Sequence, residues 1–252
     1  SNRTGAPIKA DCGFRASEGS PELWDPVTGE RRALPQFQRK DGTTTVPLEF
    51  DAFQSFFVVF GGKGQAPALS NGKNFAETKP VQEISGAWDV SFDPKWGGPE
   101  KITFDALQDW SKRPESGIKY YSGIATYRKT FQVSGLPSPV SKILLDLGTV
   151  HDMARVKLNG KDLGVVWCAP WQVEVGDALK VGENQLEIEV ANSWPNRMIG
   201  AKQPADANAR EVQAPPGFLG GQKIKTGRYT YCTYNHFNAD APLLPSGLLG
   251  PV

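Results

Sequence analysis

The sequence contains few of the residues that most often carry catalysis or hold metal ions. Its 252 residues include three cysteines, two histidines and two methionines. Three dispersed cysteines exclude a disulfide framework and a closely spaced cysteine metal cluster. A Gly-rich phosphate loop, an HExxH motif and paired CxxC motifs are also missing. These absences remove the best-marked classes of nucleotide-binding and metal-dependent enzymes.

An excess of charge and long apolar runs are missing as well. The 28 basic and 27 acidic residues leave a net charge of +1, so no overall field attracts nucleic acid or an anionic membrane. No stretch of 18 apolar residues could span a bilayer. The opening SNRTGAPIKAD has no apolar signal-peptide segment. We therefore expect neither nucleic acid nor a membrane as a partner.

The cysteines leave one alternative open. Cys168 and Cys232 both lie in aromatic-rich, strand-like segments, and they would pair if those strands were neighbours. The other interpretation treats them as buried thiols that behave as small hydrophobic residues, and the sequence favours it. The cysteines therefore do not indicate whether the protein lies in an oxidising or a reducing cellular compartment.

Turns and alternating residues dominate what is present. The 27 glycines and 20 prolines suit many strands joined by tight turns. Within residues 150–194, two alternating runs flank Asn159-Gly160, the dipeptide preferred in two-residue hairpins because both positions need a positive φ. In the following LEIEV, alternation places Leu186, Ile188 and Val190 on one face. This pattern predicts a hairpin followed by a half-buried strand.

Composition also suggests a division of the chain. Short β-branched and aromatic runs indicate a small β-sandwich module over residues 1–62, although its first strand begins almost at the first residue, which suggests a piece of a longer chain. Residues 63–79 are rich in Gly, Ser and Asn and are expected to form a linker. Residues 80–252 then form a second, larger domain. No clear helix is expected, and the region from Asn196 to Lys225 is expected to be a long irregular loop.

Several segments resemble a known family. The order NG…LG…W…P…V…L…GEN in residues 150–194, together with W…YSG…Y-R-K-F in residues 107–131, resembles the galactose-binding-like jelly roll of family 2-type glycoside hydrolases. PELWDPVTGE (residues 21–30), NSWPNRMIG (192–200) and PLLPSGLLGPV (242–252) resemble segments of family 106 glycoside hydrolases, the α-L-rhamnosidases and their relatives. The resemblance covers nearly the whole chain.

The resemblance implies an all-β fold, with a small β-sandwich module followed by a galactose-binding-like jelly-roll β-sandwich. It also implies that the chain is the C-terminal, non-barrel portion of such an enzyme. In that family the catalytic acid and base and a calcium site lie on the barrel, and no segment here can receive them. We therefore expect no catalytic residue and no cofactor, and any calcium bound to the jelly roll would be structural.

Independent of the resemblance, acidic residues and histidines are weak candidates for chemistry. Glycoside hydrolysis needs two carboxylates placed across the scissile bond. The acidic residues considered lie in segments expected to be strands or loops, where they are ordinarily solvated turn residues. These are Asp89, Asp93, Asp105, Asp109 and Asp240. His151 and His236 lack a recognisable nucleophile beside them, so hydrogen-bonded or surface histidines are expected.

Aromatic residues are better candidates, because the C–H faces of sugars stack on Trp and Tyr rings flanked by polar groups. Trp88, Trp167 and Trp171 are expected to pack in the core, as aromatic residues at alternating positions usually do. The expected carbohydrate-binding residues lie beside the long loop. They are Trp194, Asn196, Arg197, Tyr229, Tyr231, Asn235 and His236.

Three functions remain open. The first is an accessory carbohydrate-binding module of a secreted or periplasmic bacterial glycoside hydrolase, with plant cell-wall polysaccharide or oligosaccharide and the enzyme's catalytic barrel as partners. The second is a self-sufficient hydrolase that uses carboxylates of the β-sandwich. The third is a purely structural domain that packs on the barrel. Fold alone does not separate them, because jelly rolls host many functions.

Overall fold

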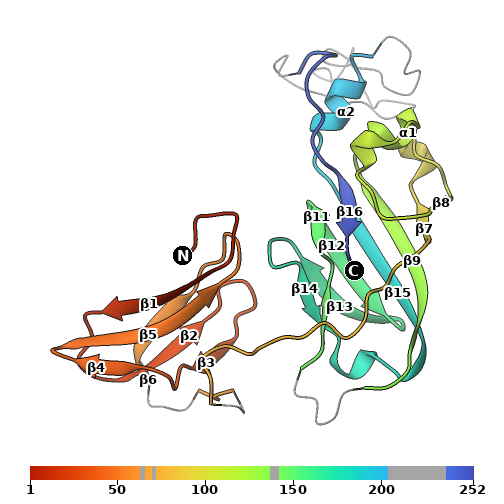
Figure 1. The fold of residues 1–252 in the computed structure, drawn as a ribbon. Helices are drawn as coiled ribbons and strands as arrows, with labels where there is room; N and C mark the ends of the chain where they lie inside the picture. The colour runs from red at the N-terminus through yellow and green to blue at the C-terminus, as the bar shows by residue number, and fades with distance from the viewer. Residues whose placement is uncertain (63–65, 70–71, 137–141, 204–236) are drawn as a thin grey trace, which may run out of the picture. The chain divides into compact units, whose positions relative to one another are not determined.

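The computed structural model describes residues 1–62, 66–69, 72–136, 142–203 and 237–252. It contains two compact units, Ser1–Gln82 (unit 1) and Glu83–Val252 (unit 2), each described by itself below. Both units consist mainly of β-strands, and the short helical turns of the described residues all lie in unit 2 (Figure 1), which confirms the predicted all-β class. None of the helices in these ranges has the length and apolar character needed to cross a membrane.

Unit 1 is a sandwich of two three-stranded antiparallel sheets, ordered β1-β5-β4 and β3-β2-β6. Its strands are β1 (Ile8–Phe14), β2 (Ser20–Trp24), β3 (Arg31–Ala33), β4 (Gln38–Lys40), β5 (Thr43–Phe50) and β6 (Phe57–Gly62). Alternate residues of β5, namely Val46, Leu48 and Phe50, are buried together with Leu23 and Leu34 because side chains alternate along a strand. This small core holds the two sheets together.

The segment expected to be a linker contributes to unit 1. Asn74 is buried, and its side-chain amide donates to the carbonyls of Gln36 (2.7 Å) and Pro47 (3.1 Å). Its side-chain oxygen accepts from the backbone N–H of Gln36 (2.8 Å). The neighbouring Phe75 packs against the core of unit 1. Composition gave no sign of this role, because it depends on partners about 30 to 40 residues away in the sequence.

Unit 2 is built on a six-stranded antiparallel sheet with the order β13-β12-β15-β9-β7-β8. Two smaller sheets, β10-β14 and β11-β16, accompany it. The strands are β7 (Trp88–Ser91), β8 (Ile102–Phe104), β9 (Ile124–Val133), β10 (Leu144–Asp146), β11 (Thr149–His151), β12 (Met153–Leu158), β13 (Lys161–Val166), β14 (Gln172–Glu174), β15 (Gly182–Ala191) and β16 (Gly247–Gly250). The helical turns are η1 (Pro94–Trp96), η2 (Trp110–Lys112), α1 (Ser116–Lys119), η3 (Gly176–Ala178) and α2 (Pro195–Gly200).

One face of the six-stranded sheet, the inner face, forms most of the hydrophobic core of unit 2. Leu186, Ile188 and Val190 of β15 are almost fully buried, as the alternation of the sequence predicts. Val150 and Leu248, from the β11-β16 sheet, belong to the same cluster, so that sheet packs against the inner face. The core therefore lies between the large sheet and the smaller ones.

The hairpin expected at Asn159-Gly160 is confirmed: it joins β12 to β13, with φ of 53° and 81° at the two turn residues.

Two expectations about other segments are wrong. Trp167, expected in the core, is 56% exposed, because the inward position is taken by Val166 and alternation turns the next residue outward. The region from Asn196 to Lys225, expected to be irregular, begins within helix α2, where Pro195 occupies the first turn and its fixed φ suits a helix start. Its residues 204–225 lie outside the described residues.

Candidate functional site

The candidate site lies where β15 ends and α2 begins. Asn192, the first residue after β15, accepts a hydrogen bond from the backbone N–H of Gly123 (3.0 Å). Its side-chain amide donates to the carbonyl of Tyr121 (2.9 Å) and to the hydroxyl of Ser246 (3.3 Å). Three segments distant in the sequence are thereby joined, so the direction of the chain leaving β15 is fixed.

The next two residues set the position of Trp194. The backbone N–H of Ser193 donates to the Asp152 carboxylate (2.8 Å), which attaches this segment to the residue that precedes β12. Trp194 is 54% exposed and stands immediately before α2. An indole presented to solvent from a hydrogen-bonded segment is a suitable surface for stacking.

Asn196 has a structural role instead of an exposed one. It is 2% exposed, and its side-chain amide donates to the carbonyl of Leu244 (2.7 Å) and the hydroxyl of Ser246 (3.1 Å). Its side-chain oxygen accepts from the N–H of Leu244 (2.8 Å). The Asn196 side chain therefore bonds both the N–H and the carbonyl of Leu244, as the backbone of a neighbouring strand would. These bonds fix the segment around Leu244 and Ser246.

The remaining expected site residues divide into two groups. Arg197 is 4% exposed, so its side chain is buried instead of offered to a ligand. Tyr229, Tyr231, Asn235 and His236 lie outside the described residues, as does Cys232. The structure therefore presents Trp194 alone, among the described members of the expected set, at the surface.

The segment held by Asn196 is also attached to the interior of unit 2. The Asp109 carboxylate accepts from the N–H groups of Ser111 (2.9 Å) and Ser246 (3.0 Å). Gly247 follows with φ of +100°, and a Cβ there would lie 2.4 Å from Trp110 Nε1, so no larger residue fits. The structural roles of Asp152 and Ser246 could not be predicted from the sequence, because their hydrogen-bond partners are remote in the chain.

Tyr127 completes this connection at the core. Its hydroxyl accepts from Trp110 Nε1 (2.5 Å) and from the backbone N–H of Leu248 (3.3 Å). Burial disfavours the phenolate and raises the pKa of Tyr127 well above its ordinary value. Tyr127 therefore remains neutral across the physiological range and serves as an acceptor for two buried donors.

The acidic residues considered for hydrolysis are placed mainly in structural positions. Asp109 is buried and caps η2, while Asp93 caps η1 through the N–H of Lys95 (2.9 Å). Asp89 is exposed and pairs with Lys101 (3.6 Å). Asp105 and Asp240 are exposed. Within the described ranges, no group of three or more His, Cys, Asp or Glu residues is arranged to hold a metal ion.

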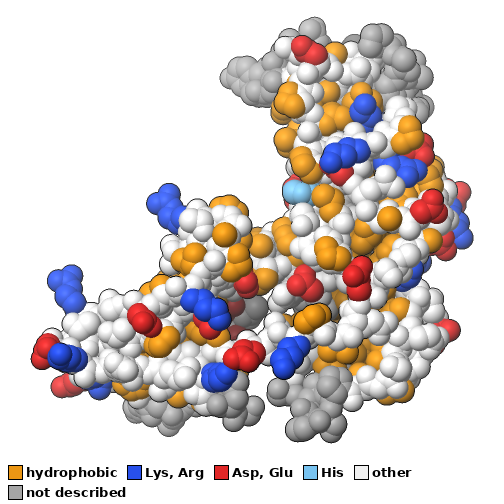
Figure 2. Space-filling model, in the orientation of Figure 1, with side chains coloured by type: hydrophobic (Ala, Val, Ile, Leu, Met, Phe, Trp, Pro, Cys, Tyr) orange, Lys and Arg blue, Asp and Glu red, His pale blue; other side chains and the backbone are white. Residues whose placement is uncertain are grey.

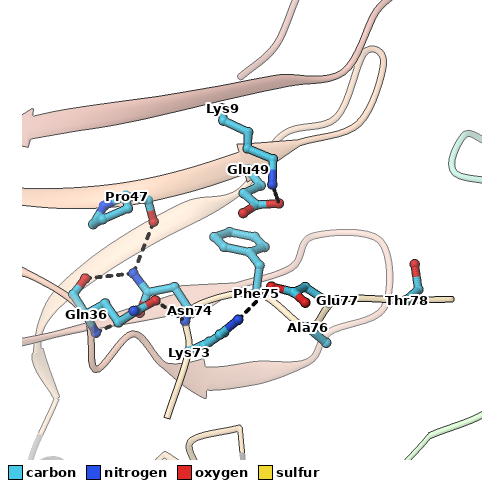
Figure 3. Close-up of a pocket in the computed structure, with 10 residues that line it drawn as sticks. All are labelled: Lys9, Gln36, Pro47, Glu49, Lys73, Asn74, Phe75, Ala76, Glu77 and Thr78. Carbon is cyan, nitrogen blue, oxygen red and sulfur yellow. Dashed lines mark hydrogen bonds and ion pairs between the residues drawn. The ribbon is translucent and has the colours of Figure 1, made fainter. Parts of the chain in front are cut away.

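A separate hollow of about 480 Å³ lies on unit 1. Figure 3 shows the Phe75 ring between the ion pair of Lys9 with Glu49 (2.9 Å) and that of Lys73 with Glu77 (2.6 Å). The amide of Asn74 at its base is already bonded to the backbone. These charged groups neutralise one another, so the hollow offers little to attract a charged ligand.

The surface of the molecule is electrostatically mixed. On the face shown in Figure 2, acidic, basic and hydrophobic side chains are interspersed, without a large area of one sign. This distribution agrees with the near-zero net charge of the sequence. A neutral ligand is therefore a better match for the surface shown than a polyanion.

Known proteins share this architecture. Residues 116–247 match the family model described as glycosyl hydrolase 2 galactose-binding domain-like. A curated protein of Formosa agariphila, provisionally named a beta-glucuronidase, is 43% identical over 174 residues, which are 67% of this chain and 15% of that protein. The solved structure of a rhamnosidase from Novosphingobium sp. PP1Y matches 99% of this chain with a TM-score of 0.75 and 36% identity. That match covers 21% of the rhamnosidase chain, so this chain spans a small part of the length of either relative.

Proposed function

This chain belongs to the glycosyl hydrolase 2 galactose-binding domain-like family, and from that membership we propose that it is an ancillary, non-catalytic β-sandwich region of a larger glycoside hydrolase. The observation that carries the proposal is the match of nearly the whole chain to about a fifth of a rhamnosidase. In this proposal a separate barrel domain of the same enzyme performs the hydrolysis.

We propose further that the parent enzyme is an α-L-rhamnosidase-like member of family 106, and that it is secreted or periplasmic and degrades plant polysaccharide. The rhamnosidase match supports the enzyme class, whereas the Formosa agariphila relative carries a different activity in its name. The sugar specificity therefore belongs to the parent enzyme's catalytic domain in this proposal. This chain contributes carbohydrate contacts and requires no cofactor.

The chemistry of the described carboxylates supports the non-catalytic role. A general acid in a glycosidase needs a raised pKa. Here the hydrogen bond from Arg113 lowers the pKa of Glu115, and that from Lys157 lowers the pKa of Glu187. Asp109 and Asp93 are used as helix caps. Glu115 and Glu187 are thus favoured in their charged forms, which suits an ion pair and not a general acid.

Carbohydrate binding is assigned to the surface around Trp194, with Tyr229, Tyr231, Asn235 and His236 as further candidates. The exposure of Trp194 on a hydrogen-bonded segment supports this assignment. For Asn196 and Arg197, burial favours a structural contribution. They would support the site by fixing the segment that presents the indole.

Affinity gel electrophoresis of the 252-residue chain tests the binding. Mobility should fall in gels that contain soluble arabinogalactan or xylan, and Trp194→Ala should restore part of it. Trp96→Ala is the matched control, because Trp96 is 42% exposed on η1 of the same unit. Unchanged mobility of the wild type with every polysaccharide would contradict carbohydrate binding.

Hydrolysis is tested separately with an aryl α-L-rhamnoside. The isolated chain should release no aryl alcohol above the rate of the buffer. Release that disappears in Asp105→Asn or Asp240→Asn would instead support a self-sufficient hydrolase. These two carboxylates are chosen because both are exposed.

A further inference from the structure

The hollow on unit 1 lies between a strand pair and the segment of residues 73–78. Lys9 of β1 and Glu49 of β5 are partners in the sheet register, and Pro47 lies two residues before Glu49 on the same face of β5. Asn74 donates to the carbonyl of Pro47 (3.1 Å), which attaches residues 73–78 beside this strand pair as the second wall (Figure 3). The hollow therefore belongs entirely to unit 1.

Its size suits a small molecule. The volume of about 480 Å³ falls within the range of about 300–1,000 Å³ that is typical of small-molecule sites. Interfaces between proteins are broader, and each partner contributes roughly 800 Å² of surface to them. A concave space of this volume therefore favours a compact ligand over a protein surface.

The walls of the hollow are held by contacts within unit 1. Gln36 accepts through its side-chain oxygen from the N–H of Asn74 (3.0 Å), and Asn74 accepts in the same way from the N–H of Gln36 (2.8 Å). The guanidinium carbon of Arg32 lies 4.8 Å from the centre of the Phe75 ring, and the ring centre of Phe56 lies 6.2 Å from it. Phe75 therefore has a fixed orientation, and a preorganised site loses less entropy on binding.

The lining combines apolar surface with a polar rim. Pro47, Phe75 and Ala76 supply the apolar part. The ion pairs Lys9–Glu49 and Lys73–Glu77 lie on either side of the Phe75 ring (Figure 3), and the exposed fractions of these four side chains range from 44% to 76%. A ring-shaped ligand stacked on Phe75 would therefore present its edge groups to both pairs.

The rim carries no net charge. The hydrogen bond with Glu77, and more weakly the charge of Glu49, raise the pKa of Lys73, so the two pairs lie within electrostatic reach of each other. An ion of either sign would meet attraction from one member of each pair and repulsion from the other. A neutral ligand avoids this conflict.

The rim nevertheless offers hydrogen bonds. A carboxylate accepts at both of its oxygens, and each ion pair occupies one of them, Oε2 of Glu49 with Lys9 and Oε1 of Glu77 with Lys73. The second oxygen of each carboxylate can therefore accept from a hydroxyl group. A ligand with an apolar ring face and several hydroxyl groups at its edge matches both parts of the lining, and a saccharide has this chemistry.

We propose that the hollow on unit 1 binds a neutral mono- or disaccharide, which stacks on Phe75 and donates hydroxyl hydrogen bonds to Glu49 and Glu77. This site goes beyond the proposed function, which assigns the carbohydrate contacts to the surface around Trp194 in unit 2. It rests on the proposed function only for the choice of sugars to be tested.

Saturation-transfer NMR and ligand titration of the 252-residue chain test the hollow, with L-rhamnose, D-galactose and xylobiose as neutral probes. D-glucuronate tests the charge assignment. Cyclohexanol, a six-membered ring with a single hydroxyl group, tests the need for several hydroxyl groups. At least one of the neutral sugars should bind more tightly than both comparison molecules.

Two variants locate the binding. Phe75→Leu should raise the dissociation constant of the bound sugar about threefold to tenfold, because leucine keeps apolar volume but lacks the flat ring. Phe57→Leu is the matched control, since Phe57 is 62% exposed in the same unit and does not line the hollow. Glu49→Gln removes the carboxylate beside Lys9, so the affinity for the neutral sugar should fall and that for D-glucuronate should rise.

The outcomes separate this site from the proposed function. Sugar binding that Phe75→Leu leaves unchanged overturns the inference, and if Trp194→Ala weakens that binding, the assignment to unit 2 remains. Tighter binding of D-glucuronate by the wild type overturns the neutral assignment, and cyclohexanol that binds as tightly as the sugars overturns the saccharide assignment. No binding of any small sugar, together with retardation in polysaccharide gels, overturns the site in the hollow alone.

Thermal unfolding followed by circular dichroism checks that each variant is folded. If Phe75→Leu does not fold, Glu49→Gln carries the test, because its side chain is 44% exposed and its ion pair contributes little to stability. Unchanged affinities of Glu49→Gln for both the neutral sugar and D-glucuronate would then overturn the inference.

Discussion

The two faces of the six-stranded sheet in unit 2 have opposite characters, although the same strands supply both. On the inner face, Trp88 and Tyr127 meet edge to face with ring centres 6.4 Å apart, and both are at most 1% exposed. On the outer face, Arg128 lies next to Tyr127 in the sequence yet pairs with Glu187 in solvent (2.9 Å). One step along β9 therefore separates the hydrophobic core from a surface of ion pairs.

This difference between the two faces determines where the sheet tolerates amino-acid substitutions. Close-packed residues of the inner face lose both transfer energy and contacts when they are truncated. Exposed ion pairs contribute little, because solvent screens them and ordering two long side chains has an entropic cost. The outer face therefore tolerates substitutions that the inner face does not.

The largest expected effect is on the inner face. Trp88→Ala should lower the free energy of unfolding of unit 2 by about 3–5 kcal/mol, because it leaves a large cavity in the core. Trp167→Ala, the same change on the outer face, should alter it by about 0.5 kcal/mol or less. Urea denaturation followed by tryptophan fluorescence reports mainly on unit 2, since every tryptophan except Trp24 lies there. Similar losses in the two variants would remove the contrast between the faces.

A smaller effect is expected for the polar group within the inner face. Tyr127→Phe should lower the free energy of unfolding by about 1–3 kcal/mol, because the buried N–H groups of Trp110 and Leu248 lose their acceptor. The same denaturation experiment measures it. A loss near zero would mean that these donors find other acceptors.

The pH dependence of Tyr127 sharpens this test. Burial raises the pKa of Tyr127 in the folded state, whereas the unfolded tyrosine ionises near its ordinary value of 10.0. Above about pH 10 the folded state therefore binds more protons, and stability falls as the pH rises, by at most about 1.4 kcal/mol per unit for this group. The wild type should thus lose stability faster than Tyr127→Phe in alkaline buffer. Parallel curves would contradict the burial argument.

The smallest effect is expected on the outer face. Glu187→Gln removes the ion pairs with Lys157 and Arg128 and should lower the free energy of unfolding by about 0.2–1 kcal/mol, less in high salt. The hydrogen bond from Lys157 holds the pKa of Glu187 below its ordinary value of 4.5. The difference between wild type and variant should therefore be present above that value and vanish as the pH falls through the lowered pKa. A difference that survives in strong acid would point to packing.

Local rules were sufficient for much of the fold. Asn159-Gly160 needs two positive φ angles and therefore predicts its hairpin, and alternation predicts the buried face of Leu186, Ile188 and Val190. Trp167 was misassigned because Val165, Val166 and Trp167 are all apolar, so alternation cannot show which of them faces inward. Only pairing with β12, through Ala154, fixes the face.

The candidate site depends more strongly on distant partners. Trp194 could be named from its residue type and from its place beside a segment that the sequence predicts to be a long loop. The burial of Asn196 could not be predicted, because its hydrogen-bond partners Leu244 and Ser246 lie 48 and 50 residues further along the chain.

The backbone N–H of Ile84 donates to the carbonyl of Val252 (2.6 Å), so residues 84 and 252 lie side by side. A short peptide connection between these two positions would therefore leave the core of unit 2 unchanged, as circular permutation requires. The exposed turn at Gly160 would then be a suitable place for new termini. Connected at residues 84 and 252 and reopened at this turn, unit 2 should keep its sheet order and its core.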